Sequence, residues 1–221
     1  MTRPRQPPDI TPDILLRAYS IGLFPMAESA SASSLFWVDP EERGIIPLDD
    51  LSISGSLTKI VRAERYEISI DTDFAGVLEA CATRGGVGGE TWINPRIRRL
   101  YCDLFAAGFA HSVECRREGR LVGGLYGVAV GAAFFGESMF HIERDASKVA
   151  LVHLVARLRR GGYCLLDTQF VTPHLASLGA IAVTRAAYRK KLEVAVAEQA
   201  DAIAWSSESM SGIEALRRAA A

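Results

Sequence analysis

The chain has 221 residues, of which 49% are hydrophobic and 23% are charged, and its formal net charge is −1. This composition is typical of a globular protein with one main core and excludes a chain that is disordered throughout. Because the near-zero net charge supplies no overall basic field, any contact with nucleic acid is expected to be local.

The N-terminal residues and the cysteines indicate the cellular compartment in which the protein is expected. Residues 1–9 are polar and proline-rich and lack the apolar segment of a secretory signal. The longest run of low polarity, residues 121–136, contains five glycines and is shorter than the roughly 20 apolar residues that span a bilayer. The four cysteines are far apart without a Cys-x-x-Cys pair, which argues against a zinc knuckle and a disulfide framework. A cytoplasmic protein with no membrane partner is therefore expected.

The first 51 residues are predicted to form a small N-terminal domain. Thr11 and Pro12 are typical of a helix start, and Gly22 is a suitable end for that helix. Residues 24–51 are rich in Pro, Ser and Asp with isolated aromatic residues such as Phe36 and Trp37, which indicates a loop-rich unit with little core of its own.

A larger domain is predicted over residues 52–200, and residues 201–221 are expected to form a loosely held tail. Apolar spacing predicts helices over residues 54–63, 74–81, 95–105, 145–160, 172–178 and 186–198. Alternating or continuous apolar runs predict strands over residues 66–70, 111–116, 121–130, 132–141, 163–167 and 181–184, the middle three as an antiparallel meander. Asp145 is predicted to cap the helix that follows it.

This order of elements predicts an α+β fold, a mixed sheet flanked by helices of the acetyltransferase-like kind, beside the small N-terminal domain. Fold alone does not give function, so the motifs decide. Gly136-Glu137-Ser138-Met139-Phe140 lacks the second glycine of a serine-hydrolase nucleophile turn. His141-Ile142-Glu143 lacks the Pro-Cys-x-x-Cys that would complete a catalytic zinc site. We expect neither a metal nor a cofactor.

Eight short segments carry the remaining information. They are Gly22-Leu23-Phe24-Pro25, Glu90-Thr91-Trp92-Ile93, Ala110-His111-Ser112-Val113-Glu114, Leu121-Val122-Gly123-Gly124-Leu125-Tyr126-Gly127, Phe135-Gly136-Glu137-Ser138-Met139-Phe140, Ala146-Ser147-Lys148, Asp167-Thr168-Gln169 and Ala176-Ser177-Leu178-Gly179-Ala180. Together and in this order they resemble the leucyl/phenylalanyl-tRNA–protein transferases over residues 11–190. The resemblance implies transfer of Leu or Phe from aminoacyl-tRNA to proteins that begin with Arg or Lys, which marks them for degradation. Whether Met is also a donor is left open.

The resemblance assigns the catalytic pair to Asp167 and Gln169, at the end of a predicted strand where alternation points both to one side. The reaction is aminolysis of an ester and needs no protein nucleophile, because the acceptor's own α-amine attacks. An amide oxygen is too weak a base to hold a proton, so we interpret Gln169 as aiming the amine and Asp167 as orienting that amide and stabilising charge on the nitrogen. The alternative for Asp167 is a cap on the following turn.

The resemblance also assigns a substrate pocket. Its apolar lining is predicted to include Leu125, Phe134, Leu151 and Leu154, which would otherwise be ordinary core residues. Glu137 is a carboxylate among apolar residues and therefore needs a partner, for which the candidates are a cationic acceptor side chain, the leucyl ammonium group or a backbone amide. The other residues assigned to substrate binding are Trp92, Tyr126, Ser138 and Met139.

Contact with tRNA is assigned to Met26, Lys59, Arg62 and Arg116. The family pattern has tryptophan at the positions of Met26 and Arg116, and arginine at those of Gly55 and Ala63. A guanidinium plane or a thioether can still offer a surface to adenosine, while Lys59 and Arg62 could also belong to an ordinary solvated helix face.

Two other functions are compatible with parts of the sequence. An acyl-coenzyme A N-acyltransferase would need backbone amides before the helix at Asp145 to bind pyrophosphate, but Glu143 and Asp145 would repel it. A non-catalytic adaptor could bind basic N-terminal residues through Glu137 and Asp167, and product formation would distinguish it.

Overall fold

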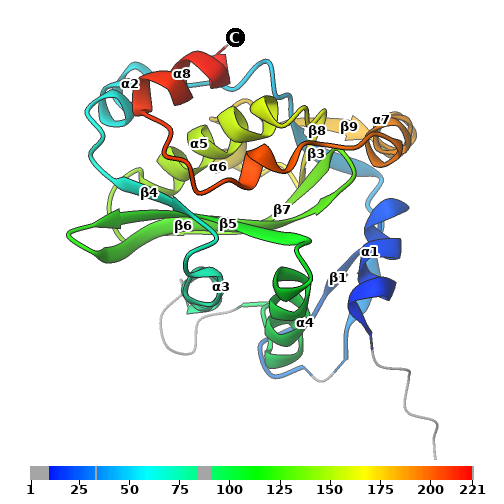
Figure 1. Cartoon of the computed structure of the whole chain (residues 1–221). Helices are drawn as coiled ribbons and strands as arrows, with labels where there is room; N and C mark the ends of the chain where they lie inside the picture. Colours follow the sequence, from blue (N-terminus) through cyan, green and yellow to red (C-terminus); the bar gives the residue numbers. More distant parts are fainter. Residues whose placement is uncertain (1–9, 33, 84–90, 221) are drawn as a thin grey trace, which may run out of the picture.

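The computed structural model describes residues 10–32, 34–83 and 91–220, which form a seven-stranded mixed sheet with helices on both faces and a separate two-stranded ribbon (Figure 1). The helices are α1 Pro12–Ser20, α2 Gly55–Arg62, α3 Phe74–Thr83, α4 Pro95–Ala106, α5 Ala146–Arg160, α6 Pro173–Ala176, α7 Arg185–Ala197 and α8 Gly212–Ala220, with a 3-10 turn η1 at Ala202–Trp205. The strands are β1 Phe24–Met26, β2 Phe36–Val38, β3 Glu42–Ile46, β4 Glu67–Ile70, β5 Ala110–Arg117, β6 Arg120–Val130, β7 Ala133–His141, β8 Leu165–Gln169 and β9 Ile181–Thr184.

The main sheet has seven strands in the order β4-β5-β6-β7-β8-β3-β9. Neighbours are antiparallel except β7 and β8, which pair in parallel only over Ala133–Phe135 and Leu165–Asp167. Both strands continue past this short ladder, β7 to His141 and β8 to Gln169. Beyond Phe135 and Asp167 the two strands are no longer paired with each other. The candidate site lies between these unpaired strand ends.

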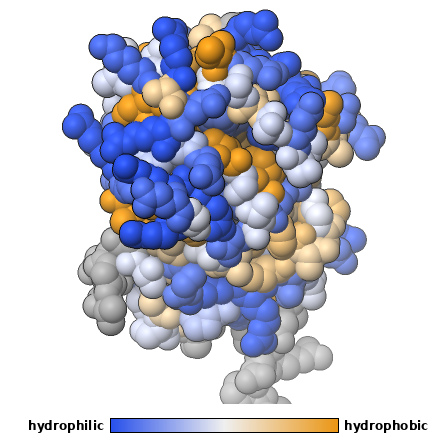
Figure 2. Space-filling model, turned by 60° about the vertical axis from the view of Figure 1, so that its left-hand side comes forward, coloured by the Kyte–Doolittle hydropathy of each residue, from blue (hydrophilic) through white to orange (hydrophobic). Residues whose placement is uncertain are grey.

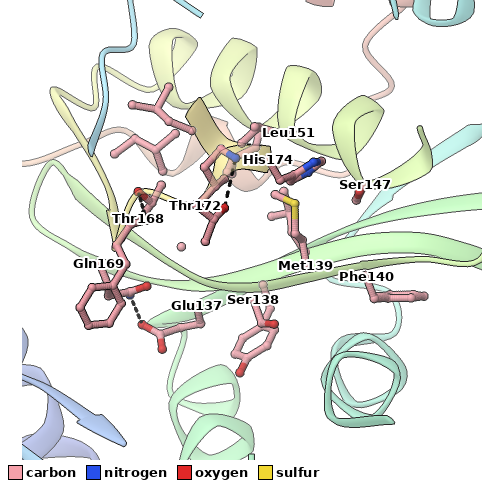
Figure 3. Close-up of a pocket in the computed structure, with 18 of the residues that line it drawn as sticks. Glu137, Ser138, Met139, Phe140, Ser147, Leu151, Thr168, Gln169, Thr172 and His174 are labelled. Carbon is pink, nitrogen blue, oxygen red and sulfur yellow. Dashed lines mark hydrogen bonds between the residues drawn. The ribbon is translucent and has the colours of Figure 1, made fainter. Parts of the chain in front are cut away.

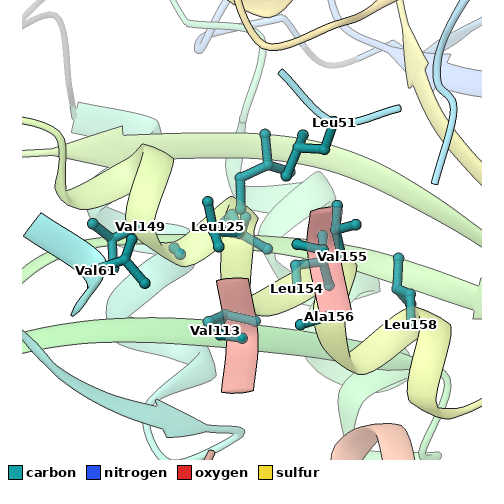
Figure 4. Close-up of a cluster of buried hydrophobic side chains, with 14 of the residues drawn as sticks. Leu51, Val61, Val113, Leu125, Val149, Leu154, Val155, Ala156 and Leu158 are labelled. Carbon is teal, nitrogen blue, oxygen red and sulfur yellow. The ribbon is translucent and has the colours of Figure 1, made fainter. Parts of the chain in front are cut away.

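Two clusters of buried apolar side chains cover the two faces of the sheet. One cluster joins α2, α5 and α8 to the sheet through residues such as Val61, Val113, Leu125 and Leu154 (Figure 4). The other joins α1, α3, α4 and α7 to the opposite face. Figure 1 shows α5 and α8 above the sheet and α3 and α4 below it. The predicted α+β class with a mixed sheet is thus confirmed, whereas the acetyltransferase-like type remains a prediction.

Most predicted helix starts are confirmed by their caps. Thr11, Asn94 and Thr172 each accept a hydrogen bond from a backbone N–H three residues on, and each precedes a proline at the start of its helix. Asp145 precedes α5 as predicted, but the predicted capping hydrogen bond from its side chain is absent. Asp145 has a φ of 63° and makes no capping bond, because its carboxylate faces the ammonium group of Lys148 at 3.1 Å instead.

The predicted loop-rich N-terminal unit contains more strand than expected. β1 and β2 pair as a two-stranded antiparallel ribbon, and β3 inserts between β8 and β9 of the main sheet. These strands are short, and β3 finds its partners more than 100 residues away in sequence, so local spacing gave little sign of them. The boundary predicted at residue 51 comes after β3, which belongs to the main sheet.

The tail predicted to be loosely held packs firmly, which corrects that expectation. α8 packs on α5 and α2 and buries Ala215 and Ala219 completely. The buried guanidinium of Arg157 donates to the backbone oxygens of Ala204, Ser206 and Glu208. The sequence did not predict this packing, because the residues that α8 buries are the small Gly212, Ala215 and Ala219.

Figure 2 shows one face of the molecule, where hydrophilic side chains surround an area in which apolar side chains reach the surface. Among the helices of the described ranges, none combines the length and the apolar character needed to cross a membrane.

Candidate active site

A cavity of about 580 Å³ opens where β7 and β8 part (Figure 3). Its wall comes from the free ends of both strands, the first half of α5, α6, and Phe24 and Met26 of the β1–β2 ribbon. Eight of the nine residues predicted to bind substrate lie in this wall, namely Trp92, Leu125, Tyr126, Glu137, Ser138, Met139, Leu151 and Leu154. The ninth, Phe134, lies outside the wall and packs against Trp205 at a ring distance of 5.2 Å.

Glu137 is the centre of a hydrogen-bond network at the polar corner of the cavity. Its Oε1 accepts from Tyr19 Oη at 2.7 Å, and its Oε2 accepts from Tyr101 Oη at 2.7 Å. The two tyrosine oxygens also lie 2.6 Å apart. Because each phenol has one proton, all three O···O contacts are hydrogen bonds at the same time only when Glu137 is protonated. The partners that the sequence required for this carboxylate are thus two tyrosines from α1 and α4. No local pattern could reveal them, because Tyr19 is 118 residues away.

The side-chain amide of Gln169 is held by the same carboxylate. Gln169 Nε2 donates to Glu137 Oε1 at 3.1 Å (Figure 3). Gln169 also has a φ of 58°, a left-handed conformation that is uncommon for residues other than glycine and that persists only when the surroundings fix it. Because the amide nitrogen is engaged by Glu137, the amide oxygen is the group of Gln169 that can accept a hydrogen bond from a molecule in the cavity.

Asp167 lies in a second network that is fully buried. Its carboxylate accepts from Arg43 Nη2 at 2.7 Å, from Arg43 Nε at 3.0 Å and from the hydroxyl of Tyr188. It also accepts the backbone N–H of Gln169 at 2.7 Å. The expectation that Asp167 orients the Gln169 amide is therefore corrected in its geometry: Asp167 contacts the Gln169 backbone, and Glu137 contacts the amide.

Burial changes the pKa of the groups in the polar corner. Burial raises the pKa of Glu137 to about 7, although the hydroxyls of Tyr19 and Tyr101 oppose this shift by donating to the carboxylate. Burial and the nearby Glu137 carboxylate also raise the pKa of both tyrosines well above the ordinary value. The tyrosines therefore stay protonated as donors, while Glu137 changes charge near neutral pH.

The residues predicted to contact tRNA are not gathered at the cavity. Met26 lies in its wall, but Lys59 and Arg62 lie on the exposed side of α2. Arg116 on β5 donates to Asp73 at 3.1 Å and to the Gly119 carbonyl at 3.3 Å. Its guanidinium is thus tied to neighbouring protein groups and not placed beside the cavity.

Sequence reasoning missed a polar group at the other end of the cavity. His141, Ser147, Thr172 and His174 belong to the wall there, and Figure 3 shows Ser147 and His174 toward Met139 and away from Gln169. Burial lowers the pKa of His174, and Lys148 and His141 add to the effect. The only signal in the sequence was the Ala146-Ser147-Lys148 segment. Glu90 of the Glu90-Thr91-Trp92-Ile93 segment lies outside the described residues.

Comparison of the sequence with known proteins identifies the family of this chain. Residues 45–193 match the family model described as "Leucyl/phenylalanyl-tRNA protein transferase", and residues 8–41 match the model of its N-terminal domain. The chain belongs to the leucyl/phenylalanyl-tRNA–protein transferase family. The predicted resemblance is confirmed by this match over most of the chain.

Curated members of the transferase family are closely similar to this chain. A leucyl/phenylalanyl-tRNA–protein transferase of Rhodopseudomonas palustris (strain BisB18) is 56% identical over 87% of this chain and 84% of the relative. One of Afipia carboxidovorans is 59% identical over 85% and 83%. One of Paramagnetospirillum magneticum is 56% identical over 86% and 91%. The cavity takes its wall from both matched segments, because Phe24 and Met26 lie in residues 8–41 and the other wall residues lie in residues 45–193.

Proposed function

We propose that this chain transfers leucine or phenylalanine from aminoacyl-tRNA to the α-amine of proteins that begin with Arg or Lys, with the cavity between β7 and β8 as its active site. The reaction class is that of the family to which the chain belongs. The product carries a new bulky apolar N-terminal residue, which marks the acceptor for degradation.

The observation that carries the site assignment is the hydrogen bond from Gln169 Nε2 to Glu137 Oε1. It leaves the Gln169 amide oxygen to accept an N–H of the incoming α-amine, which aims the nitrogen lone pair at the ester carbonyl. Fixing two reactants in this way lowers the entropic part of the barrier. Asp167 acts indirectly: its carboxylate accepts the backbone N–H of Gln169 and does not contact the amine.

The bonds and protons of the reaction balance without a protein nucleophile. The amine nitrogen forms the new C–N bond, the C–O bond to the terminal ribose breaks, and the proton released by nitrogen ends on the departing ribose oxygen. An α-amine has a pKa of about 8, so part of it is neutral and reactive at pH 7. The protein contributes orientation and an environment that favours the charge developing on nitrogen.

The cavity wall also supports the choice of substrates. Among the described residues Glu137 is the only acidic side chain in the wall, so it is the group available to attract a cationic N-terminal residue. The leucines at 125, 151, 154 and 166 line the apolar part. A pocket of this kind separates donors that differ by one methylene by only about 1–3 kcal/mol, so Leu and Phe are both expected to react, and Met stays open as a third donor. The β-branched Ile and Val are expected to react poorly.

The test is transfer of labelled leucine to an arginine-terminated peptide. Leu-tRNA should serve as donor, while free leucine with ATP and acetyl-coenzyme A should not. An N-acetylated peptide should be inert because it lacks the attacking lone pair, and Ile-tRNA should be a poor donor. Transfer from acetyl-coenzyme A without transfer from Leu-tRNA would refute the proposal. Efficient leucylation of an aspartate-terminated peptide would refute only the acceptor assignment.

A further inference from the structure

The β1–β2 ribbon presents two different faces. Its register pairs Phe24 with Val38, Pro25 with Trp37 and Met26 with Phe36. Directly opposed residues of an antiparallel pair lie on one face, and alternate residues of a strand share that face. Phe24, Met26, Val38 and Phe36 therefore form one face, and Pro25 and Trp37 the other. Only the first face reaches the cavity, since Phe24 and Met26 are in its wall and Pro25 is not.

Phe36 is the outermost member of the face that reaches the cavity. Its side chain is 44% exposed, whereas Phe24 on the same face is 3% exposed. Its partner Met26 lies in the cavity wall, and directly opposed Cβ atoms are about 4.5–5.5 Å apart. In the part of the chain that the structure describes, no other aromatic ring packs on Phe36. An open aromatic surface thus continues the wall outward past Met26.

We propose that Phe36 is the stacking surface for the nucleotide that precedes the terminal adenosine of the donor tRNA. This inference rests on the proposed function, because the donor's aminoacyl adenosine must enter the cavity while its chain continues outside. The end of a tRNA that carries the amino acid is single-stranded, and single strands bind proteins by stacking bases on aromatic side chains. Phe36 lies one residue beyond the cavity wall, where the next base emerges.

Trp37 provides a matched control. It is 38% exposed, adjacent in sequence and on the same strand, but its register partner is Pro25 on the opposite face. Replacing Trp37 removes a comparably exposed aromatic side chain from the same ribbon without changing the face that leads to the cavity. A general effect of ribbon instability would appear in both variants, whereas stacking by Phe36 would appear in one.

The experiment compares KM and kcat of Phe36→Ala, Phe36→Leu, Phe36→Trp and Trp37→Ala. Three donors are used: Leu-tRNA, leucyl-adenosine, and leucyl cytidylyl-adenosine, which adds one nucleotide. Phe36→Ala should raise KM about tenfold for Leu-tRNA and for the dinucleotide donor, and leave KM for leucyl-adenosine and for the acceptor peptide unchanged. Phe36→Trp should retain the affinity of the parent, Phe36→Leu should lose it, and Trp37→Ala should match the parent.

Each other outcome overturns the inference in an identifiable way. An equal rise in KM for leucyl-adenosine would place the effect at the terminal adenosine. A rise in KM for the acceptor peptide alone would make Phe36 part of an acceptor surface. Full affinity in both Phe36→Ala and Phe36→Leu would remove Phe36 from binding altogether. If the parent chain transfers leucine from none of the three donors, the proposed function fails, and the inference fails with it.

Discussion

The polar corner of the cavity and the exposed face of α2, which we propose to act on the same substrate, are built in opposite ways. At the corner, both carboxylate oxygens of Glu137 are hydrogen-bonded. Behind it, the buried Asp167 accepts from four donor atoms of three residues. On α2, Lys59 and Arg62 are exposed, and neither forms an ion pair with another described residue. The corner fixes positions, whereas the α2 face offers only charge.

This difference fits the role that we propose for each region. Attack of an amine on an ester depends on placement to within a fraction of an ångström, which only buried and mutually bonded groups provide. Attraction of a phosphate backbone depends on the number of positive charges and tolerates mobile side chains. Substitutions in the corner should therefore be costly and specific, and substitutions on α2 should be mild and dependent on salt.

Asp167→Ala should have the largest effect. It leaves the guanidinium of Arg43, which is 1% exposed, buried without its counter-ion, and breaking such a pair lowers the free energy of unfolding by about 3–5 kcal/mol. The measurement is urea unfolding followed by circular dichroism. Asp39→Ala is the control, because it removes solvent-accessible pairs with Arg185 and Arg189, each of which is worth about 1 kcal/mol or less. Equal stability of the two variants would contradict the structural role given to Asp167.

Gln169→Ala should come next and should act on turnover. Removal of the amide oxygen that we propose to aim the amine is expected to lower kcat by about tenfold or more while KM for Leu-tRNA changes little. The measurement is steady-state kinetics with an arginine-terminated peptide. Thr168→Ala is the matched control, because Thr168 lies in the same wall one residue away. Undiminished turnover in Gln169→Ala would exclude Gln169 from the chemical step.

The pH dependence of Glu137 sharpens the role of the corner. Protonation removes the negative charge with which Glu137 is proposed to attract the cationic acceptor, and it turns one of its oxygens from an acceptor into a donor. Because burial raises its pKa to about 7, kcat/KM should increase as pH rises through about 7, before the acceptor amine completes its own titration near 8. Glu137→Gln should lose the lower inflection and keep the upper one, as measured by rate profiles from about pH 5.5 to about 8.5.

The same shift predicts the sign of an effect on stability. The folded state binds the proton of Glu137 more tightly than the unfolded state, whose carboxyl has the ordinary value of 4.5. The contribution of Glu137 to the free energy of unfolding is therefore largest below about pH 4.5 and decreases as pH rises toward 7. Urea unfolding of the parent and of Glu137→Gln at about pH 5 and about pH 8 measures this. A parent whose stability relative to Glu137→Gln does not decrease over this interval would contradict the raised pKa.

Local chemistry made part of the molecule predictable. The caps at Thr11, Asn94 and Thr172 and the apolar periodicity that follows them located the helices, and glycine turns separated the strands of the meander. The long-range partners were not predictable. Nothing near Glu137 in sequence points to Tyr19 or Tyr101, and nothing near Asp167 points to Arg43. Their side chains meet only because the sheet brings distant strands and helices together.

Neutralising Lys59 and Arg62 together should have the smallest effect. For each phosphate that the protein no longer neutralises, about one counterion fewer is released on binding. The slope of log affinity against log salt should therefore become shallower by about 1–2, and affinity at low salt should fall only modestly. The measurement is donor binding between about 50 and 200 mM salt. Neutralising Arg189 on α7, an exposed arginine paired with Asp39, is the control. A slope identical to that of the parent would place the tRNA footprint elsewhere.

The hydrogen bond from Tyr19 to Glu137 limits how this protein can be recombined. Tyr19 lies in the segment matched by the N-terminal family model, and Glu137 lies in the segment matched by the other. The same N-terminal segment supplies Phe24 and Met26 to the cavity wall. The two segments that the family models match separately therefore form one site together. A chimera of two relatives joined between these segments would keep its function only if the donor of the first segment brought a phenol to the position of Tyr19.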